Sequence, residues 1–129
     1  MAELVDFLRQ CSQVQTFPAF GIEGISGVDV IARLDADVMV EATPTDLVDG
    51  GIGRDHVFSA IDRGMDIVSA NKGPFVLFYA ELFQKALKSG SGLYISAATA
   101  AALPTLDVGL NCLAGSRVSS AEGILNGTT

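Results

Sequence analysis

One lysine in this chain stands where a cation could act on a bound ligand. Residues 66–74 read DIVSANKGP: a short apolar run, then Asn71 and Lys72, then Gly73 and Pro74. In an open parallel sheet, ligands bind at the loops that leave the carboxyl ends of the strands. An ammonium group there could orient a reacting oxygen and stabilise negative charge that develops on it. The alternative interpretation is a surface lysine in an ordinary strand–helix connection.

The segments around this loop predict an α/β sheet. Apolar runs at 37–42, 66–70 and 93–97 have the length and composition of buried strands. Between them, residues 54–63 and 75–88 carry apolar side chains at helical spacing. This order of strand, helix, strand, helix, strand is typical of a parallel sheet with right-handed crossovers. The run at 37–42 is expected to be buried on both faces, as central parallel strands are.

Local signals add detail to this outline. Gly73 is expected to relax the turn after Lys72, and Pro74 suits the first helical position because its missing N–H would have no partner there. Weaker patterns predict helices over 2–10, 27–34 and 104–114 and a fourth strand over 118–125. His56, the only histidine, lies near the start of a predicted helix and is interpreted as a solvated surface residue.

The composition excludes several classes of protein. The chain has 129 residues, a net charge of −7, 49% hydrophobic residues and a mean hydropathy of +0.41, which suits one core-rich globular domain. The basic residues are scattered, so we expect no face for nucleic acid. No apolar run approaches the roughly 18–20 residues that a membrane helix needs, and the first residues lack a signal-peptide pattern. Cys11 and Cys112 are interpreted as reduced, packed thiols of a cytoplasmic protein.

The glycine-rich turn that holds a dinucleotide pyrophosphate has no counterpart in this sequence. Gly50-Gly51-Ile52-Gly53 and Gly90-Ser91-Gly92 each contain part of G-x-G-x-x-G, but both lack its full spacing and are interpreted as turns. The predicted fold class is therefore α/β, a partial Rossmann-like parallel sheet with flanking helices that lacks the first βαβ portion. We expect the chain to be an interior piece of a longer enzyme.

Three motifs resemble one enzyme family. SANKGP at 69–74 closely resembles the ANKGP segment of homoserine dehydrogenases, and VEATPT at 40–45 and EGILNGTT at 122–129 resemble that family in the same order. The resemblance is clear from about Ala36 onward. It implies a partial NAD(P)-binding domain over 1–103, the beginning of the catalytic domain over 104–129, and a homodimer in the full-length parent.

The resemblance also implies an activity and a set of site residues. The family interconverts L-homoserine and L-aspartate 4-semialdehyde with NAD or NADP, in threonine and methionine biosynthesis. Lys72 corresponds to the family lysine beside the nicotinamide and the substrate, and is the expected catalytic residue. Thr43 corresponds to a threonine near the cofactor, although it could simply cap the turn before Pro44. The other expected contacts are Ser69, Ala70 and Asn71 to the cofactor, and Gly127 and Thr128 to the amino-acid substrate.

One stretch both resembles the family and departs from it. SAATAAALP at 96–104 resembles a segment that lines the nicotinamide site and binds a monovalent cation, partly through main-chain carbonyls. By this resemblance Ala100 and Ala101 would contact the cofactor, and sodium would meet Ser96, Thr99, Ala101 and Leu103. Alanine replaces both glycines of the family pattern and serine replaces its acidic ligand. Alanine limits close approach to the backbone, and loss of the carboxylate weakens a cation site.

Two other functions stay open at this point. A truncated or degenerate relative that acts only by packing or association would explain the alanine pair and the absent glycine-rich turn. Another dehydrogenase with a similar sheet would explain the threonine and lysine loops, but not EGILNGTT. Since the sequence also lacks the family's second lysine, we expect the 129-residue chain to be inactive by itself.

Overall fold

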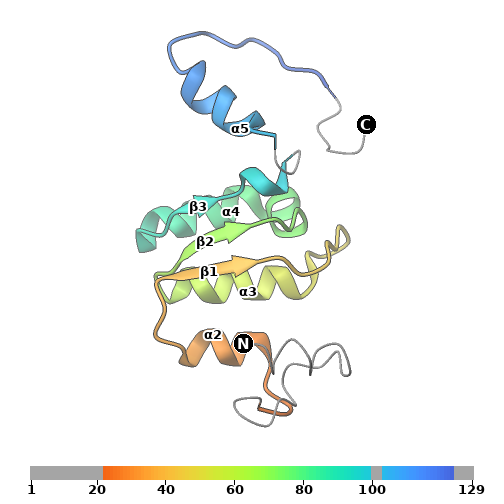
Figure 1. The fold of residues 1–129 in the computed structure, drawn as a ribbon, viewed down its shortest axis with the longest axis vertical. Coiled ribbons are helices and arrows are strands. Elements are labelled where there is room, and N and C mark those ends of the chain that lie inside the picture. Colours follow the sequence, from red (N-terminus) through yellow and green to blue (C-terminus); the bar gives the residue numbers. More distant parts are fainter. Residues whose placement is uncertain (1–21, 100–102, 124–129) are drawn as a thin grey trace, which may run out of the picture.

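The computed structural model describes residues 22–99 and 103–123, and its centre is a three-stranded parallel sheet (Figure 1). The strands lie in the order β1 (Val38–Glu41), β2 (Asp66–Ser69) and β3 (Leu93–Tyr94). Val40 pairs with Val68 in the first ladder, and Val68 pairs with Tyr94 in the second. All three strands run the same way, so the carboxyl ends of β1 and β2 meet at one edge. The predicted fold class is confirmed.

Two helices connect the strands and cover one face of the sheet. They are α3 (Gly51–Asp62) and α4 (Gly73–Ser89), both behind the strands in Figure 1. The prediction that residues 50–53 form a turn was wrong for most of this segment. Gly50 alone precedes the helix, in a left-handed conformation with φ 86° that favours glycine, and residues 51–53 are the first turn of α3. Gly90, with φ 78°, ends α4 in the same conformation.

The core lies between these helices and the sheet. Side chains from α3, β2 and α4 are completely buried there, because each helix turns its apolar stripe toward the strands. An ion pair between Lys85 of α4 and Asp62 of α3 joins the two helices at the rim of this core. The most deeply buried apolar residues are Val57, Ala60, Ile61, Ile67 and Leu82.

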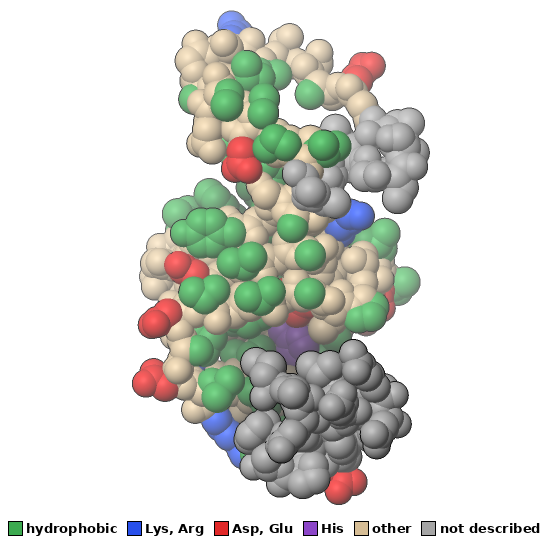
Figure 2. All heavy atoms as spheres, viewed as in Figure 1, with side chains coloured by type: hydrophobic (Ala, Val, Ile, Leu, Met, Phe, Trp, Pro, Cys, Tyr) green, Lys and Arg blue, Asp and Glu red, His purple; other side chains and the backbone are tan. Residues whose placement is uncertain are grey.

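The other face of the sheet is exposed within the described residues. Val38 and Val40 of β1, Val68 of β2 and Tyr94 of β3 point to this side, and Figure 2 shows hydrophobic side chains over the strands. The prediction that residues 37–42 are buried on both faces was therefore wrong for the described part of the chain. Strand alternation places Met39 and Glu41 toward the helices and the two valines outward.

The segments that flank this unit are shorter or less regular than predicted. Helix α2 (Gly27–Arg33) is confirmed, and Ser26 caps it through a reciprocal pair of bonds with Asp29. β3 ends at Tyr94, and a 3-10 turn η2 (Ser96–Ala98) follows it. The helix predicted over 104–114 is α5 (Thr105–Asp107) followed by the π-helical η3 (Val108–Cys112).

The last predicted strand is absent from the described residues. Residues 118–123 have no strand and are exposed, because no strand of the described ranges pairs with them. Cys112 is exposed rather than packed, which corrects the prediction for that thiol. Cys11 and the helix predicted over 2–10 lie outside the described residues. In the part of the chain that the structure describes, no helix has the length and apolar character to cross a membrane.

Candidate functional site

A buried carboxylate lies at the end of β1. Glu41 is only 1% exposed, because strand alternation points it toward α3. Its Oε1 accepts hydrogen bonds from Thr43 N at 2.7 Å, from Thr43 Oγ1, and from Asn71 Nδ2 at 3.3 Å. Its Oε2 lies 2.9 Å from His56 Nδ1. A buried charge is tolerated when its hydrogen bonds are complete, and Glu41 meets this condition.

Asn71 continues the network from the end of β2. Its Nδ2 also donates to Thr43 Oγ1 at 3.2 Å, and its Oδ1 accepts from Gly73 N at 3.0 Å. The Ser69 hydroxyl accepts from Asn71 N and donates to Asn71 O, both at 3.1 Å. Ser69 and Asn71 are both buried. The two loops that follow β1 and β2 are therefore joined by side chains that have little freedom to move.

Lys72 stands at the surface directly after this buried cluster. It is the N-cap of α4, and Pro74 is the second residue of the helix, one position later than predicted. Gly73 was expected to relax the turn after Lys72, but its φ is not positive and its role is a different one. A Cβ at Gly73 would overlap the backbone oxygen of Asp46, so glycine allows the start of α4 to touch the loop after β1. Lys72 and Thr43 thus lie on neighbouring loops, those that follow β2 and β1.

His56 is part of the site, which corrects the prediction of a solvated surface residue. Its side chain is 14% exposed and its Nδ1 faces Glu41. Within the described residues its Nε2 is buried without a hydrogen-bond partner, against Gly27. The tautomer that suits this environment carries its proton on Nδ1, which then donates to Glu41. Helical spacing could have revealed it, since Gly53, His56 and Ala60 lie on one face of α3.

The charge of Glu41 depends on these partners. Burial raises the pKa of this carboxyl, but hydrogen bonds from Thr43, His56 and Asn71 lower it by more. The pKa of Glu41 therefore lies below its ordinary value of 4.5. The carboxylate is ionised at neutral pH, when it accepts every hydrogen bond offered to it.

The Thr43 hydroxyl is already engaged by protein groups. It donates its only proton to Glu41 and accepts a hydrogen bond from Asn71 Nδ2. A hydroxyl has one proton and two lone pairs, so one lone pair is left for a ligand. The predicted contact of Thr43 with a cofactor stays a prediction, but this side chain can enter it only as an acceptor.

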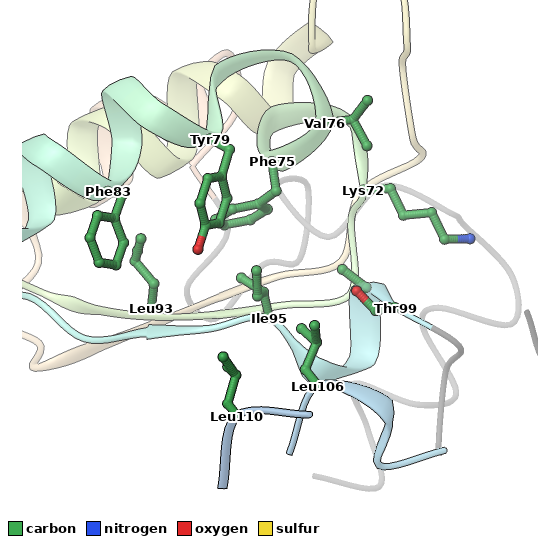
Figure 3. Close-up of a pocket in the computed structure, with 11 residues that line it drawn as sticks. Lys72, Phe75, Val76, Tyr79, Phe83, Leu93, Ile95, Thr99, Leu106 and Leu110 are labelled. Atoms are coloured by element: carbon green, nitrogen blue, oxygen red, sulfur yellow. The ribbon is translucent and has the colours of Figure 1, made fainter. Parts of the chain in front are cut away.

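An apolar cavity of about 520 Å³ lies beside this loop, between α4, β3 and the segment 105–110 (Figure 3). Phe75, Tyr79 and Ile95 point toward it, whereas the ammonium of Lys72 stands at the rim and points away. The cavity and the cation therefore face different sides of the loop. The other labelled lining residues are Val76, Phe83, Leu93, Thr99, Leu106 and Leu110.

The other predicted residues that the structure describes, Ser96, Thr99 and Leu103, take no part in the hydrogen bonds around Glu41. Ser96 lies in η2, where its hydroxyl donates to Asp107 at 3.0 Å, and the Thr99 carbonyl accepts from Thr105 at 3.2 Å. Leu103 is exposed. Ala100, Ala101, Gly127 and Thr128 lie outside the described residues. No group of three histidine, cysteine, aspartate or glutamate side chains that could hold a metal ion occurs in the described ranges.

Comparison with known proteins decides the family. Residues 25–96, which include the strands, α3, α4 and both loops, match the family model described as homoserine dehydrogenase, NAD binding domain. The chain belongs to the homoserine dehydrogenase family. Two of the three motifs noted in the sequence, VEATPT and SANKGP, fall inside this match.

Curated homoserine dehydrogenases support the same assignment. The homoserine dehydrogenase of Methanocaldococcus jannaschii is 35% identical over all 129 residues, and that of Corynebacterium glutamicum is 38% identical over 102 residues. The second alignment covers 78% of this chain. The chain spans only 38% and 22% of the lengths of these two relatives.

Solved homoserine dehydrogenase structures have the same fold. One from Thiobacillus denitrificans gives a TM-score of 0.63 with 27% identity, over 71% of this chain and 20% of that chain. A hyperthermophilic archaeal homoserine dehydrogenase in complex with NADPH gives a TM-score of 0.69 with 17% identity, over 83% and 32%. The three-stranded sheet and its helices are therefore part of the Rossmann-like NAD-binding domain of this family.

Proposed function

We propose that this chain forms part of the cofactor and substrate site of a homoserine dehydrogenase. In this reaction the alcohol carbon of L-homoserine gives a hydride to NAD or NADP and the hydroxyl loses a proton, which yields L-aspartate 4-semialdehyde. The reverse reaction returns the hydride and the proton to the aldehyde. The enzyme must hold the reacting carbon against the nicotinamide and stabilise charge on the oxygen.

The observation that carries this proposal is the position of Lys72. Its ammonium is exposed at the carboxyl end of β2, where ligands bind in open α/β sheets. The buried Asn71 and the close packing of Gly73 on the Asp46 backbone hold the residues on either side of it. A fixed cation beside a reacting oxygen stabilises the negative charge that develops there, and it requires little reorganisation during the reaction.

The described residues fit one end of a dinucleotide. The loops after β1 and β2 form an edge with the Thr43 hydroxyl as acceptor and the Lys72 ammonium as donor. These groups suit the polar atoms of a ribose and a carboxamide. A bound nicotinamide would supply the hydride acceptor, and Ser69, Ala70 and Asn71 would shape its surroundings. The amino-acid substrate would meet Gly127 and Thr128, and a monovalent cation would meet Ser96, Thr99, Ala101 and Leu103.

Replacement of Lys72 tests this function. In the protein as its gene encodes it, we expect Lys72→Ala to lower kcat by about 10²- to 10³-fold, because a preorganised charge at the reacting oxygen is lost. The rate is followed as NADPH oxidation with L-aspartate 4-semialdehyde. Lys88→Ala is the matched control, since Lys88 is an exposed lysine in the last turn of the same helix. Equal kcat and KM in the wild type and Lys72→Ala would reject the role of Lys72.

The same assay separates the catalytic function from a non-catalytic one. An enzyme shows turnover in the wild type that Lys72→Ala removes and Lys88→Ala keeps. A relative that acts only by packing or association shows no turnover in any of the three proteins. The replacement of the family's acidic cation ligand by Ser96, whose hydroxyl is bonded to Asp107, is the observation that keeps the second possibility in the test.

A further inference from the structure

We propose that Glu41 is a positioning residue, whose buried carboxylate ties the loop after β1 to the loop after β2 and so sets Thr43 and Lys72 at a fixed spacing. This inference rests on the proposed function for its effect on catalysis. Glu41 does not touch the solvent edge where a ligand would bind, being 1% exposed. It acts on the site through the groups that it holds.

The hydrogen bonds of Glu41 reach both loops. One oxygen of Glu41 accepts from both the backbone and the side chain of Thr43, two residues further along the chain in the loop after β1. The same oxygen accepts from Asn71, which is thirty residues away in sequence. A single atom therefore receives donors from both loops. Its movement would alter both of them together.

The hydrogen bonds of Asn71 hold the backbone around Lys72. The Asn71 side chain reaches Glu41 and Thr43 with its nitrogen and accepts from Gly73 N with its oxygen. Asn71 and Gly73, the residues before and after Lys72, are therefore joined by a hydrogen bond. Because the Ser69 hydroxyl bonds both the N–H and the carbonyl of Asn71, the backbone before Lys72 has few other conformations available. The carboxylate thus determines the position of the Lys72 backbone, from which the side chain extends.

Helix α3 limits the space around Glu41 and Asn71. Gly53 of α3 is buried against the cluster, and a Cβ there would overlap Asn71 Nδ2 and lie 3.4 Å from Glu41 Oε1. His56, one turn further along α3, faces the other carboxylate oxygen at 2.9 Å. The helix therefore closes the cluster from one side. The carboxylate has no room to rotate toward other hydrogen-bond partners. It therefore holds the two loops in one relative position.

Three substitutions separate reach from charge. Glu41→Gln keeps the length of the side chain and an acceptor for Thr43 and Asn71, but removes the charge. Glu41→Asp keeps the charge and shortens the side chain by one methylene, so it cannot bridge both loops. Glu41→Ala removes both. Leu82→Ala is the matched control, because Leu82 is fully buried in the core and belongs to no part of the cluster.

The expected result is an order of activity. In the protein as its gene encodes it, well below every melting temperature, we expect kcat to fall by about 10- to 100-fold in Glu41→Ala, since a displacement of about 1 Å can lower a rate that much. The kcat should fall by about tenfold in Glu41→Asp and by less than about threefold in Glu41→Gln. Leu82→Ala should lower the melting temperature while kcat stays unchanged. The proposal would be overturned if Glu41→Asp were more active than Glu41→Gln. It would also be overturned if the losses of kcat simply followed the losses of melting temperature.

A second measurement does not need turnover. Amide hydrogen exchange of peptides that cover 42–50 and 70–76 should accelerate in both segments together in Glu41→Asp and Glu41→Ala, and stay slow in Glu41→Gln and Leu82→Ala. Exchange that accelerates in only one of these segments would also reject the tie between them. If the wild type has no dehydrogenase activity, the proposed function fails while this measurement still decides whether Glu41 joins the loops. If Glu41→Ala does not fold, the comparison of Asp with Gln carries the test.

Discussion

Glu41 and Asn71 show how much the candidate site depends on single atoms. A buried polar group without its partners destabilises the folded state, whereas one with every bond formed makes its surroundings rigid. Glu41 accepts four hydrogen bonds or polar contacts, and the Asn71 side chain uses both its oxygen and its nitrogen. The backbone that carries the exposed Lys72 therefore has little conformational freedom, which is what a charge-stabilising group requires.

Gly53 is the residue of α3 that packs against the Asn71 side chain. Alanine in a helix interior normally stabilises a protein by roughly 0.5–1 kcal/mol relative to glycine. At Gly53 the added methyl group would overlap Asn71 Nδ2 and break its bonds to Glu41 and Thr43, so we expect Gly53→Ala to lower the free energy of unfolding by about 1–2 kcal/mol. Chemical denaturation measures it. Gly109→Ala is the control, because nothing lies within 4 Å of that position. A gain in stability for Gly53→Ala would contradict this account.

At the scale of elements, the site is a meeting of two loops rather than one motif. The loop after β1 crosses the start of α4 so closely that Gly73 has no room for a Cβ beside the Asp46 backbone. Backbone atoms cannot swing aside as a side-chain tip does. Helix α3 lies against both loops, since Gly53 is buried against Asn71 and His56 faces Glu41.

Gly73→Ala tests this contact between elements. The methyl group must push the start of α4 away from the loop after β1, and overpacking of this kind lowers stability by about 1–3 kcal/mol. We also expect weaker equilibrium binding of NADPH, followed by nucleotide fluorescence, because Thr43 and Lys72 move apart. Gly64→Ala is the control: its φ is +73° but nothing lies within 4 Å, so it introduces backbone strain alone. Unchanged NADPH affinity in Gly73→Ala, or an equal loss in Gly64→Ala, would count against the contact.

At the scale of the whole molecule, the buried charge links stability to pH. The pKa of Glu41 is lower in the folded chain than the ordinary value of 4.5, because its hydrogen bonds outweigh its burial. The unfolded chain therefore binds the proton more tightly. The stabilisation due to this carboxylate is fully present above about pH 4.5 and is lost as the pH falls through the lower folded pKa.

Melting temperatures measured from about pH 7 down to about pH 3 check this linkage. We expect the wild type to lose stability faster than Glu41→Gln below about pH 4.5, since the glutamine cannot take up a proton. The pKa of Asp29 is also lowered, by its hydrogen bonds with Ser26, but this group titrates in both proteins and cancels in the difference. A difference between the two proteins that stays constant over the whole range would contradict the linkage.

Much of the fold could be predicted from the sequence because its signals are local. Apolar runs and helical spacing indicated β1, α3, β2 and α4, and Pro74 indicated the start of α4. The strand predicted over 118–125 was wrong in its described part, because a strand needs a partner that a local pattern does not provide. The prediction that residues 37–42 are buried on both faces was wrong for the same reason, since burial depends on what lies against the strand.

The candidate site divides in the same way. The sequence by itself determined the loop that carries Lys72 and its order with Thr43, because each follows an apolar run that forms a strand. Only the tertiary structure decided that Glu41, His56 and Asn71 meet, at sequence separations of 15 and 30 residues. Their contact requires the parallel register of β1 with β2 and the turn of α3 that faces them. Neither is a property of any short segment, so the buried partners of the exposed lysine were fixed only when the chain packed.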